Sequence, residues 1–345
     1  MTEKLVSIVM PAYNAGDCIE KSLGCILNQS YKNIELVVID DGSKDDTAEK
    51  LRRLSEKDSR LKAFSVENGG PAKARNIALG HISEKSDYVM FADSDDQLLP
   101  DAVEYALKAA ESGADMVIFG FTIVDAQGGE RNYCERAQII EREEFKDSFA
   151  RLYKANLLNQ VWGKLYKSSL IKENAVEFPD YRWGEDRIFI FDCLKHVKKL
   201  AVLPECKYRY IMQPGESLIT KYYDKKFSVC KEIDRRVQKI CRELHVEDDA
   251  DFKYMYSKSV FSCITNMYSP SCKLKKGEKR EAVKNIIEDP SIKQRCNKAS
   301  GGLPVKILNA CLRSGSPGLN LFAFKMVSVV GRKAPALFIK LKHKK

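Results

Sequence analysis

Short β-branched apolar runs alternate with helical patterns over residues 1–125 of this chain. The predicted strands are 5–10, 34–39, 61–66, 87–92 and 115–121, and the predicted helices between them are 18–28, 46–57, 72–81 and 101–112. Strands that alternate with helices in this way form a mostly parallel, doubly wound sheet. The expected fold class is therefore α/β, with a Rossmann-like sheet flanked by helices.

Three of the predicted strands end in polar loops. These loops contain Pro11-Ala12-Tyr13, Asp40-Asp41 and Asp93-Ser94-Asp95-Asp96. In an open parallel sheet, ligands bind beyond the carboxyl ends of the strands. Because the three loops share that edge, the sequence predicts a single crevice lined by acidic and aromatic side chains.

The acidic loop at 93–96 predicts a site for a hard divalent cation. Carboxylates this close repel one another unless a cation or hydrogen-bond donors compensate them. Mn²⁺ and Mg²⁺ prefer oxygen ligands, and Mg²⁺ commonly combines one or two carboxylates with phosphate oxygens. The alternative is a helix N-terminus rich in capping acids, because Asp101 begins a helix nearby. The two other polar loops at the same edge favour the metal.

Other residues at this edge suit a nucleotide, each with a structural alternative. Asp41 would accept a hydrogen bond from a nucleobase or ribose, although Asp-Gly is also a common turn pair. Tyr13 would stack on a base or simply pack. Lys73 and Arg75 begin a helix after a Gly-Gly-Pro loop, where phosphate binds well, or they lie on a solvated helix face.

Glu185 and Asp186 open a predicted helix that runs from Arg187 to about Lys195. A carboxylate near an acceptor hydroxyl can serve as a general base, and the alternative is an acidic helix cap. The four histidines show no metal-ligand spacing, and no dinucleotide-binding or Walker glycine loop is present.

Several of these segments together resemble bacterial family-2 glycosyltransferases with the GT-A fold. The matching segments are VSIVMPAYNAGDCIEKSLGCILNQSYKNIELVVIDDGSKDDT, NGGPAKARNIAL, YVMFADSDDQLLPDAVE, VWGKLYKSSLI and WGEDRIF, in the family's order. They cover residues 4–220, most densely 4–110. The resemblance implies an inverting transfer from a nucleotide-diphosphate sugar, usually a uridine one, to a glycan or lipid-linked glycan acceptor in surface polysaccharide synthesis.

The resemblance also implies roles for individual residues. The nucleotide-sugar site would comprise Pro11, Ala12, Tyr13, Asp40, Asp41, Lys73, Arg75, Asp93 and Ser94, with Asp41 facing uracil. Asp93 and Asp95 would form the DxD metal motif, and Asp95 would be the direct ligand of Mn²⁺ or Mg²⁺. Asp186 would deprotonate the acceptor and Glu185 would support it. Trp162, Lys164 and Trp183 would lie on the acceptor side.

One stretch departs from the family's pattern. Members often carry basic residues in the segment that matches 210–220, where this chain has Ile211 and Gln213, although Ser217 remains. Closure over the diphosphate would then depend on other groups, such as Arg209 or Lys221. The resemblance implies a catalytic domain at 1–220, with a nucleotide-sugar half at 1–125 and an acceptor half at 126–220.

The region 221–345 is mainly helical by its periodicity and strongly basic. Residues 271–345 hold 18 Lys and Arg against 4 Asp and Glu, and no acid follows Asp289. Residues 303–345 mix apolar runs with cations, which is typical of a segment that lies on an anionic membrane surface. The alternative is an ordinary helical subdomain. Nucleic-acid binding is disfavoured, because aromatic and basic residues do not interleave as a stacking platform.

Composition favours a cytoplasmic protein that lies peripherally at the inner face of the cell membrane. The chain has 11 cysteines, an odd and scattered set, and its start lacks a secretory pattern. No stretch reaches the roughly 18 apolar residues that a spanning helix needs. Two other functions remain as alternatives: a nucleotidyltransferase, which should carry a basic glycine-rich loop after the first strand, and a non-catalytic scaffold, which should lack the acids.

Overall fold

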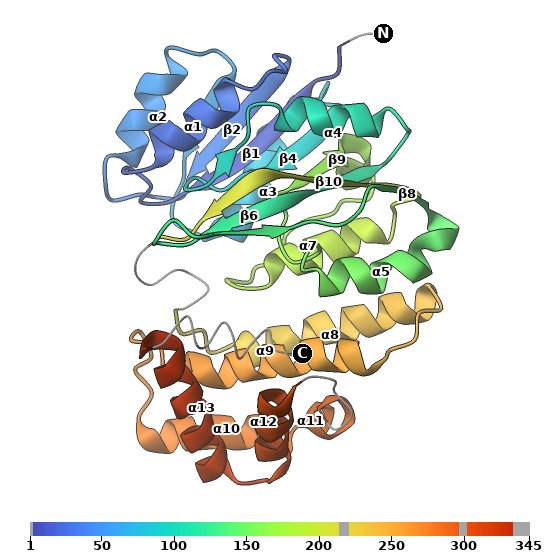
Figure 1. The fold of residues 1–345 in the computed structure, drawn as a ribbon. Helices are drawn as coiled ribbons and strands as arrows, with labels where there is room; N and C mark the ends of the chain where they lie inside the picture. Colours follow the sequence, from blue (N-terminus) through green and yellow to red (C-terminus); the bar gives the residue numbers. More distant parts are fainter. Residues whose placement is uncertain (1–2, 214–220, 297–301, 334–345) are drawn as a thin grey trace. The chain divides into compact units, whose positions relative to one another are not determined.

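The computed structural model describes residues 3–213, 221–296 and 302–333, and Figure 1 shows its two compact units. Contacts divide the chain into Met1–Pro214 and Gly215–Lys345. Each unit is described by itself below. The expected boundary at 220 lies close to this division.

A mixed sheet forms the core of the first unit (Figure 1). Within the described part of the chain it has ten strands, with the order β3-β2-β1-β4-β9-β6-β10-β5, and β7 and β8 pair with β6 and β10. The bounds are β1 Val6–Ala12, β2 Ile34–Asp40, β3 Leu61–Ser65, β4 Tyr88–Phe91, β5 Gln97–Leu98, β6 Met116–Val124, β7 Glu130–Tyr133, β8 Gln138–Glu141, β9 Lys164–Lys167 and β10 Lys199–Ile211. The expected α/β class with a mostly parallel GT-A-like sheet is confirmed.

Parallel pairing places the predicted polar loops at one edge of the sheet. Strand β1 pairs in parallel with β2 and β4, and β2 with β3. The register sets Ala12 beside Asp40 and Val9 beside Phe91. Strand β2 is buried along its whole length, because both faces of the sheet are covered. The carboxyl ends of β1, β2 and β4 therefore open toward the same side.

Helices pack against this sheet, largely where the apolar spacing predicts them. They are α1 Ile19–Leu27, α2 Thr47–Ser55, α3 Pro71–His81, α4 Ala102–Ala110, a 3₁₀ turn at Arg142–Glu144, α5 Phe145–Lys154, α6 Ser168–Lys172 and α7 Glu185–Leu194. Helix α3 packs on β1 and β2, whereas α4 packs on β6 and β10. Helix α3 begins with proline, which suits a first helical position.

Two elements differ from the sequence-based expectation. The apolar run 161–171 contains β9, which inserts antiparallel between β4 and β6. The two strands expected at 200–203 and 207–211 are one strand, β10, whose pairing with β6 shifts register between Val202 and Tyr208. The polar residues between the two apolar runs thus form an irregularity within β10, and the strand continues past them.

The second unit is helical, as the periodicity predicts. Its helices are α8 Lys226–Glu243, α9 Ala250–Asn266, α10 Lys276–Glu288, α11 Pro290–Arg295, α12 Leu303–Arg313 and α13 Pro317–Lys333. Helices α8 and α9 pack on each other, and α13 packs on α9, α10 and α12. Among the residues placed in the structure, no helix has the length and apolarity needed to cross a bilayer. Residues 334–345 of the predicted membrane-facing segment lie outside the described residues.

Candidate active site

The acidic loop after β4 is anchored by one of its own carboxylates. Tyr208 donates its hydroxyl to Asp96 over 2.8 Å, and the Ile211 backbone N–H donates to the other Asp96 oxygen over 2.8 Å. The Asp93 N–H in turn donates to the Tyr208 hydroxyl over 3.1 Å. Burial raises the pKa of Asp96 well above its usual value. Asp96 therefore ties the loop to β10, and the neighbouring acids are left for other partners.

The Asp95 carboxylate has no hydrogen bond or ion pair to any other described side chain. It is partly buried, and burial, with Asp93 as a second cause, raises its pKa to about 6. An ionised Asp95 in this setting needs a cation or a donor from outside the chain. No group of three His, Cys, Asp or Glu that could hold a metal occurs among the residues described. Two carboxylates completed by phosphate oxygens, the arrangement Mg²⁺ favours, fit this loop.

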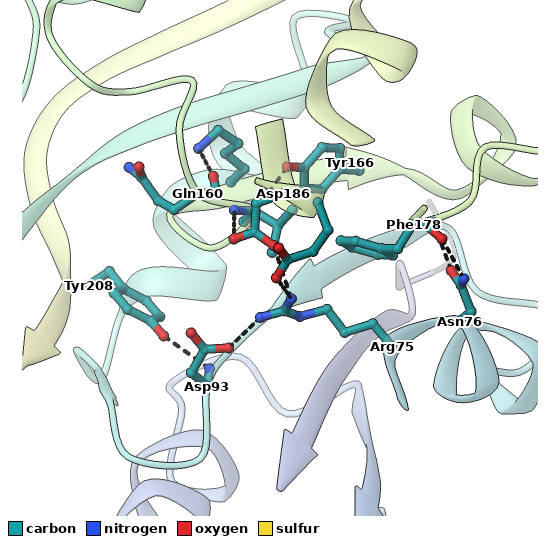
Figure 2. Close-up of polar contacts among 11 residues, drawn as sticks. Arg75, Asn76, Asp93, Gln160, Tyr166, Phe178, Asp186 and Tyr208 are labelled. Atoms are coloured by element: carbon teal, nitrogen blue, oxygen red, sulfur yellow. Dashed lines mark hydrogen bonds and ion pairs between the residues drawn. The ribbon is translucent and has the colours of Figure 1, made fainter. Parts of the chain in front are cut away.

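Arg75 joins the acidic loop to the start of α7 (Figure 2). Its guanidinium lies 2.8 Å from Asp93, 2.9 Å from Asp186 and 3.4 Å from Glu185. The Arg75 side chain is buried, and its ring neighbour Phe178 lies 5.5 Å away. Carboxylates more than 90 positions apart in the sequence therefore meet on one buried cation.

Carboxyl groups outnumber cationic groups at this junction. Burial raises the pKa of Glu185 to about 7, and the adjacent Asp186 charge contributes to that rise. Burial also raises the pKa of Asp186, although Arg75 opposes the shift. The Asp186 Oδ1 atom accepts from Arg75, and Oδ2 accepts from the Val161 N–H over 3.3 Å. Strongly perturbed carboxyl groups of this kind concentrate at functional sites.

Asp40 and Asp41, at the end of β2, are both buried and both hold loops in place. Asp41 accepts from the backbone N–H groups of Gly69 and Gly70 over 2.7 and 2.8 Å. Gly70 has a φ of +90°, which a residue with a side chain rarely adopts, and it precedes helix α3. Asp41 thus fixes the turn that begins the helix carrying Arg75. Its contact with uracil stays a prediction.

The remaining nucleotide-side residues differ in exposure. Tyr13 is 50% exposed, so its ring is open to a planar ligand, whereas Ala12 is buried in β1. Pro11 and Ser94 are half-buried, and Lys73 is exposed between the buried Ala72 and Ala74 of α3. Tyr13 and Lys73 are thus the exposed side chains of this set. Their nucleotide contacts stay predictions.

Two of the three expected acceptor-side residues are buried. Trp162 is 7% exposed and stacks on Tyr208 with ring centroids 4.4 Å apart, and Lys164 is only 1% exposed. Trp183 is half-buried, with the Arg187 guanidinium 4.9 Å from its ring. Of the three, Trp183 has the most accessible ring. Burial places Trp162 and Lys164 beneath the surface that an acceptor would touch.

The segment that departs from the family's pattern acts through its backbone. Ile211 supplies its N–H to Asp96, a contact that does not depend on the side chain. Arg209 is paired with Glu130 on β7 over 2.6 Å. Ser217 lies outside the described residues, and Lys221 belongs to the second unit. Sequence reasoning also missed Tyr208, for which the only signal was its place in an alternating aromatic strand.

Comparison with known proteins identifies the family. The family described as Glycosyl transferase family 2 matches residues 7–176. An uncharacterized glycosyltransferase of Haemophilus influenzae is 34% identical over 201 residues, covering 58% of this chain and 75% of that protein. The poly(ribitol-phosphate) beta-glucosyltransferase of Bacillus spizizenii is 28% identical, covering 63% of this chain and 34% of that protein.

A solved structure shares the fold across nearly the whole chain. S. aureus TarS 1-349 in complex with UDP-GlcNAc aligns with a TM-score of 0.65 and 20% identity, covering 96% of this chain and 92% of that one. The family assignment sets aside the nucleotidyltransferase and scaffold alternatives. With its GT-A sheet and its sequence relatives, the chain belongs to glycosyltransferase family 2 and is a glycosyltransferase.

Proposed function

We propose that this glycosyltransferase moves a sugar from a UDP-sugar to a hydroxyl of a glycan acceptor, with inversion at the anomeric carbon. One observation carries the proposal: Asp93 beyond β4 and Asp186 at the start of α7 meet on the buried guanidinium of Arg75. A donor held at the acidic loop would therefore lie next to a carboxylate that can accept a proton. This juxtaposition suits a single displacement on the donor sugar.

The donor side is formed by the loops after β1, β2 and β4. The exposed Tyr13 ring offers a face for a base, and the loop after β4 offers carboxylates to a metal–diphosphate group. TarS, which has the same fold, is described in complex with UDP-GlcNAc. That likeness supports a uridine nucleotide as the donor's leaving group.

The acidic loop fits a divalent cation. The Asp95 carboxylate has no side-chain partner among the described residues, and Asp93 keeps one oxygen that Arg75 does not contact. Asp95, together with Asp93, would hold Mn²⁺ or Mg²⁺. A bound cation would supply charge that stabilises the departing diphosphate.

Asp186 is the proposed general base. Each of its oxygens accepts one hydrogen bond from the chain, from Arg75 and from Val161, and each keeps a second lone pair. An acceptor hydroxyl could donate there while its oxygen attacks the anomeric carbon. The proton passes to Asp186, and the bond between the sugar and the diphosphate breaks. Arg75 opposes the rise in the Asp186 pKa that burial causes and so favours the ionised base.

The proposed acceptor is a surface glycan or a lipid-linked glycan. The relative from Bacillus spizizenii is named for transfer to poly(ribitol-phosphate), which supports an extended acceptor in cell-surface polysaccharide synthesis. The half-buried Trp183 beside Arg187, just before α7, offers a ring face for a sugar. The sugar and the linkage are not specified by these contacts.

The second unit supports association with the inner face of the cell membrane. Helices α12 and α13 expose apolar side chains, 46–71% accessible, at Leu303, Ile307, Leu319, Phe322 and Met326. The spacing 319, 322 and 326 places three of them on one side of α13. Exposed Lys306 and Lys325 accompany them, and the chain has no acid beyond Asp289. Apolar anchors among cations suit an anionic lipid surface.

Vesicle binding tests the membrane proposal. Replacing Leu319 and Phe322 with Asp should weaken binding to phosphatidylglycerol-containing vesicles at least about tenfold, because it removes apolar anchors and adds negative charge. Phosphatidylcholine vesicles are the control and should bind weakly. Equal binding of the parent protein to both vesicle types, or no loss in the variant, would contradict the proposal.

A donor screen tests the transferase proposal. The purified protein with Mn²⁺ and a panel of nucleotide sugars should release UDP from a UDP-sugar, and chelation of the metal should stop the release. Asp186→Asn should lower transfer at least about 1000-fold while nucleotide binding persists, because only the proton acceptor is lost. Asp192→Asn, in the same helix, should leave transfer unchanged. Release of UDP from none of the donors would refute the proposal.

A further inference from the structure

The turn that precedes β9 carries the backbone amide that contacts Asp186. Gly163 in this turn has a φ of +69°, a conformation that glycine adopts at little cost. The Val161 N–H donates to Asp186 Oδ2 over 3.3 Å. The position of this turn therefore decides where one oxygen of the proposed base lies.

Three consecutive backbone carbonyls of the turn accept hydrogen bonds from two buried side chains of β9. Lys164 donates its ammonium to the Gln160 carbonyl over 2.5 Å and to the Trp162 carbonyl over 3.2 Å. Tyr166 donates its hydroxyl to the Val161 carbonyl over 3.1 Å. Figure 2 shows Gln160 and Tyr166 on the side of Asp186 away from Asp93. The carbonyls are thus held by β9 while the Val161 amide is free to meet the carboxylate.

A lysine is energetically unfavourable at the buried position 164 unless its hydrogen-bond donors are used. Lys164 is 1% exposed, and burial lowers the pKa of its ammonium to about 7, although Asp186 opposes the shift. A lysine at such a position destabilises the fold relative to an apolar side chain of similar length unless its hydrogen bonds and charge are used. Both uses converge on Asp186: the hydrogen bonds fix the turn, and the positive charge faces the carboxylate.

We propose that Lys164 and Tyr166 are positioning residues that hold the 160–163 turn so that its amide fixes the Asp186 carboxylate. The inference rests on the proposed role of Asp186 as general base. Neither side chain touches the acceptor, because both are buried. Arg75 restrains the other oxygen, so the carboxylate is held from two sides by independent elements.

Steady-state kinetics of Lys164→Met and Tyr166→Phe test the proposal. Lys164→Met removes the donors to two carbonyls and should lower kcat about 100-fold, because misplacing a reacting group by about 1 Å has an effect of that size. Tyr166→Phe removes one hydroxyl, keeps the ring packing and should lower kcat about fivefold. Donor KM and the affinity for UDP should stay within about twofold in both, because the donor loops are untouched.

The pH profile separates the charge of Lys164 from its hydrogen bonds. The charged groups that face Asp186 are Arg75 from α3, Asp93 from the acidic loop, Lys164 from β9 and the adjacent Glu185. Below pH 7 the Lys164 ammonium favours ionised Asp186, so its loss should raise the Asp186 pKa and move the acid limb of kcat/KM to higher pH. Tyr166→Phe should leave that limb in place.

Controls distinguish this inference from the function on which it rests. Lys172→Met removes another lysine that donates to a backbone carbonyl, that of Ser83, and should leave kcat unchanged. If the parent enzyme transfers sugar and Asp186→Asn abolishes transfer, yet Tyr166→Phe and Lys164→Met both keep full kcat, the positioning role is wrong while the proposed function stands. If Lys164→Met does not fold, an unchanged kcat in Tyr166→Phe alone is enough to overturn the positioning role. A parent enzyme without transfer refutes the proposed function itself.

Discussion

Arg75 in the first unit and Arg295 in the second are both buried arginines that bridge carboxylates distant in sequence. Each side chain is only 5% exposed. Arg295 uses Nε and Nη2 on Asp234, over 3.1 and 2.7 Å, and Nη1 on Asp248. Arg75 uses both Nη atoms, and its Nε atom has no hydrogen-bond partner among the residues that the structure describes. The two sites share a residue type and differ in how completely it is satisfied.

The charge balance around the two arginines also differs. Arg295 faces two carboxylates, and Asp248 is 31% exposed, although its Oδ1 atom is buried without a hydrogen-bond partner among the described residues. Arg75 faces Asp93, Glu185 and Asp186, and Asp95 adds a further carboxylate nearby. The first arrangement therefore has one carboxylate more than it has cations. The second has a larger surplus of carboxyl groups over cations, which a bound cation would relieve, and this difference separates a structural ion pair from a candidate site.

Removing Arg75 should have the largest effect. Arg75→Met leaves the buried Glu185 and the partly buried Asp93 and Asp186 without their shared cation and frees Asp186 on one side, so transfer should fall about 1000-fold or more. Arg75→Lys should restore part of the activity, because it keeps the charge and loses the fork that spans Asp93 and Asp186. The measurement is UDP release per folded protein, with thermal unfolding recorded for each variant.

Two results for the Arg75 variants would change this interpretation. If Arg75→Met folds and transfers sugar at nearly the parent rate, Arg75 resembles Arg295 and the junction of Asp93 with Asp186 is structural. If Arg75→Lys is as inactive as Arg75→Met, the two-pronged geometry matters more than the charge.

The sequence predicts most of the first unit and the chemical type of its site. Alternating apolar runs define β1 to β4 and β6, because buried parallel strands are short, β-branched and bounded by polar loops. Strand β9 escapes prediction because the run 161–171 mixes apolar residues with glycine, lysine and serine and lacks the strict alternation that marks a strand. The pairing order of the sheet follows from contacts across the fold and not from local pattern.

Within the site, sequence identifies the acids but not their partners. Asp93, Asp95 and Asp186 stand out because carboxylates after strands or at helix starts are chemically informative. Arg75 is predicted to face phosphate, yet its partners lie 18, 110 and 111 positions away, and no local pattern encodes them. The contact of the Val161 amide with Asp186 could not be predicted from the sequence, because nearly every residue type has a backbone N–H.

Removing Arg295 should lower the stability of the protein without affecting sugar transfer, in contrast to the removal of Arg75. Arg295→Met leaves the buried Asp234 without its cationic partner and should lower the free energy of unfolding of the helical unit by about 3–5 kcal/mol. Arg235→Met removes an exposed pair with Glu232 on α8 and should cost less than about 1 kcal/mol. Calorimetry measures both, and UDP release per folded protein should match the parent in each. A loss of turnover in Arg295→Met without a loss of stability would mean that this ion pair supports catalysis, because a purely structural pair affects only the population of folded protein.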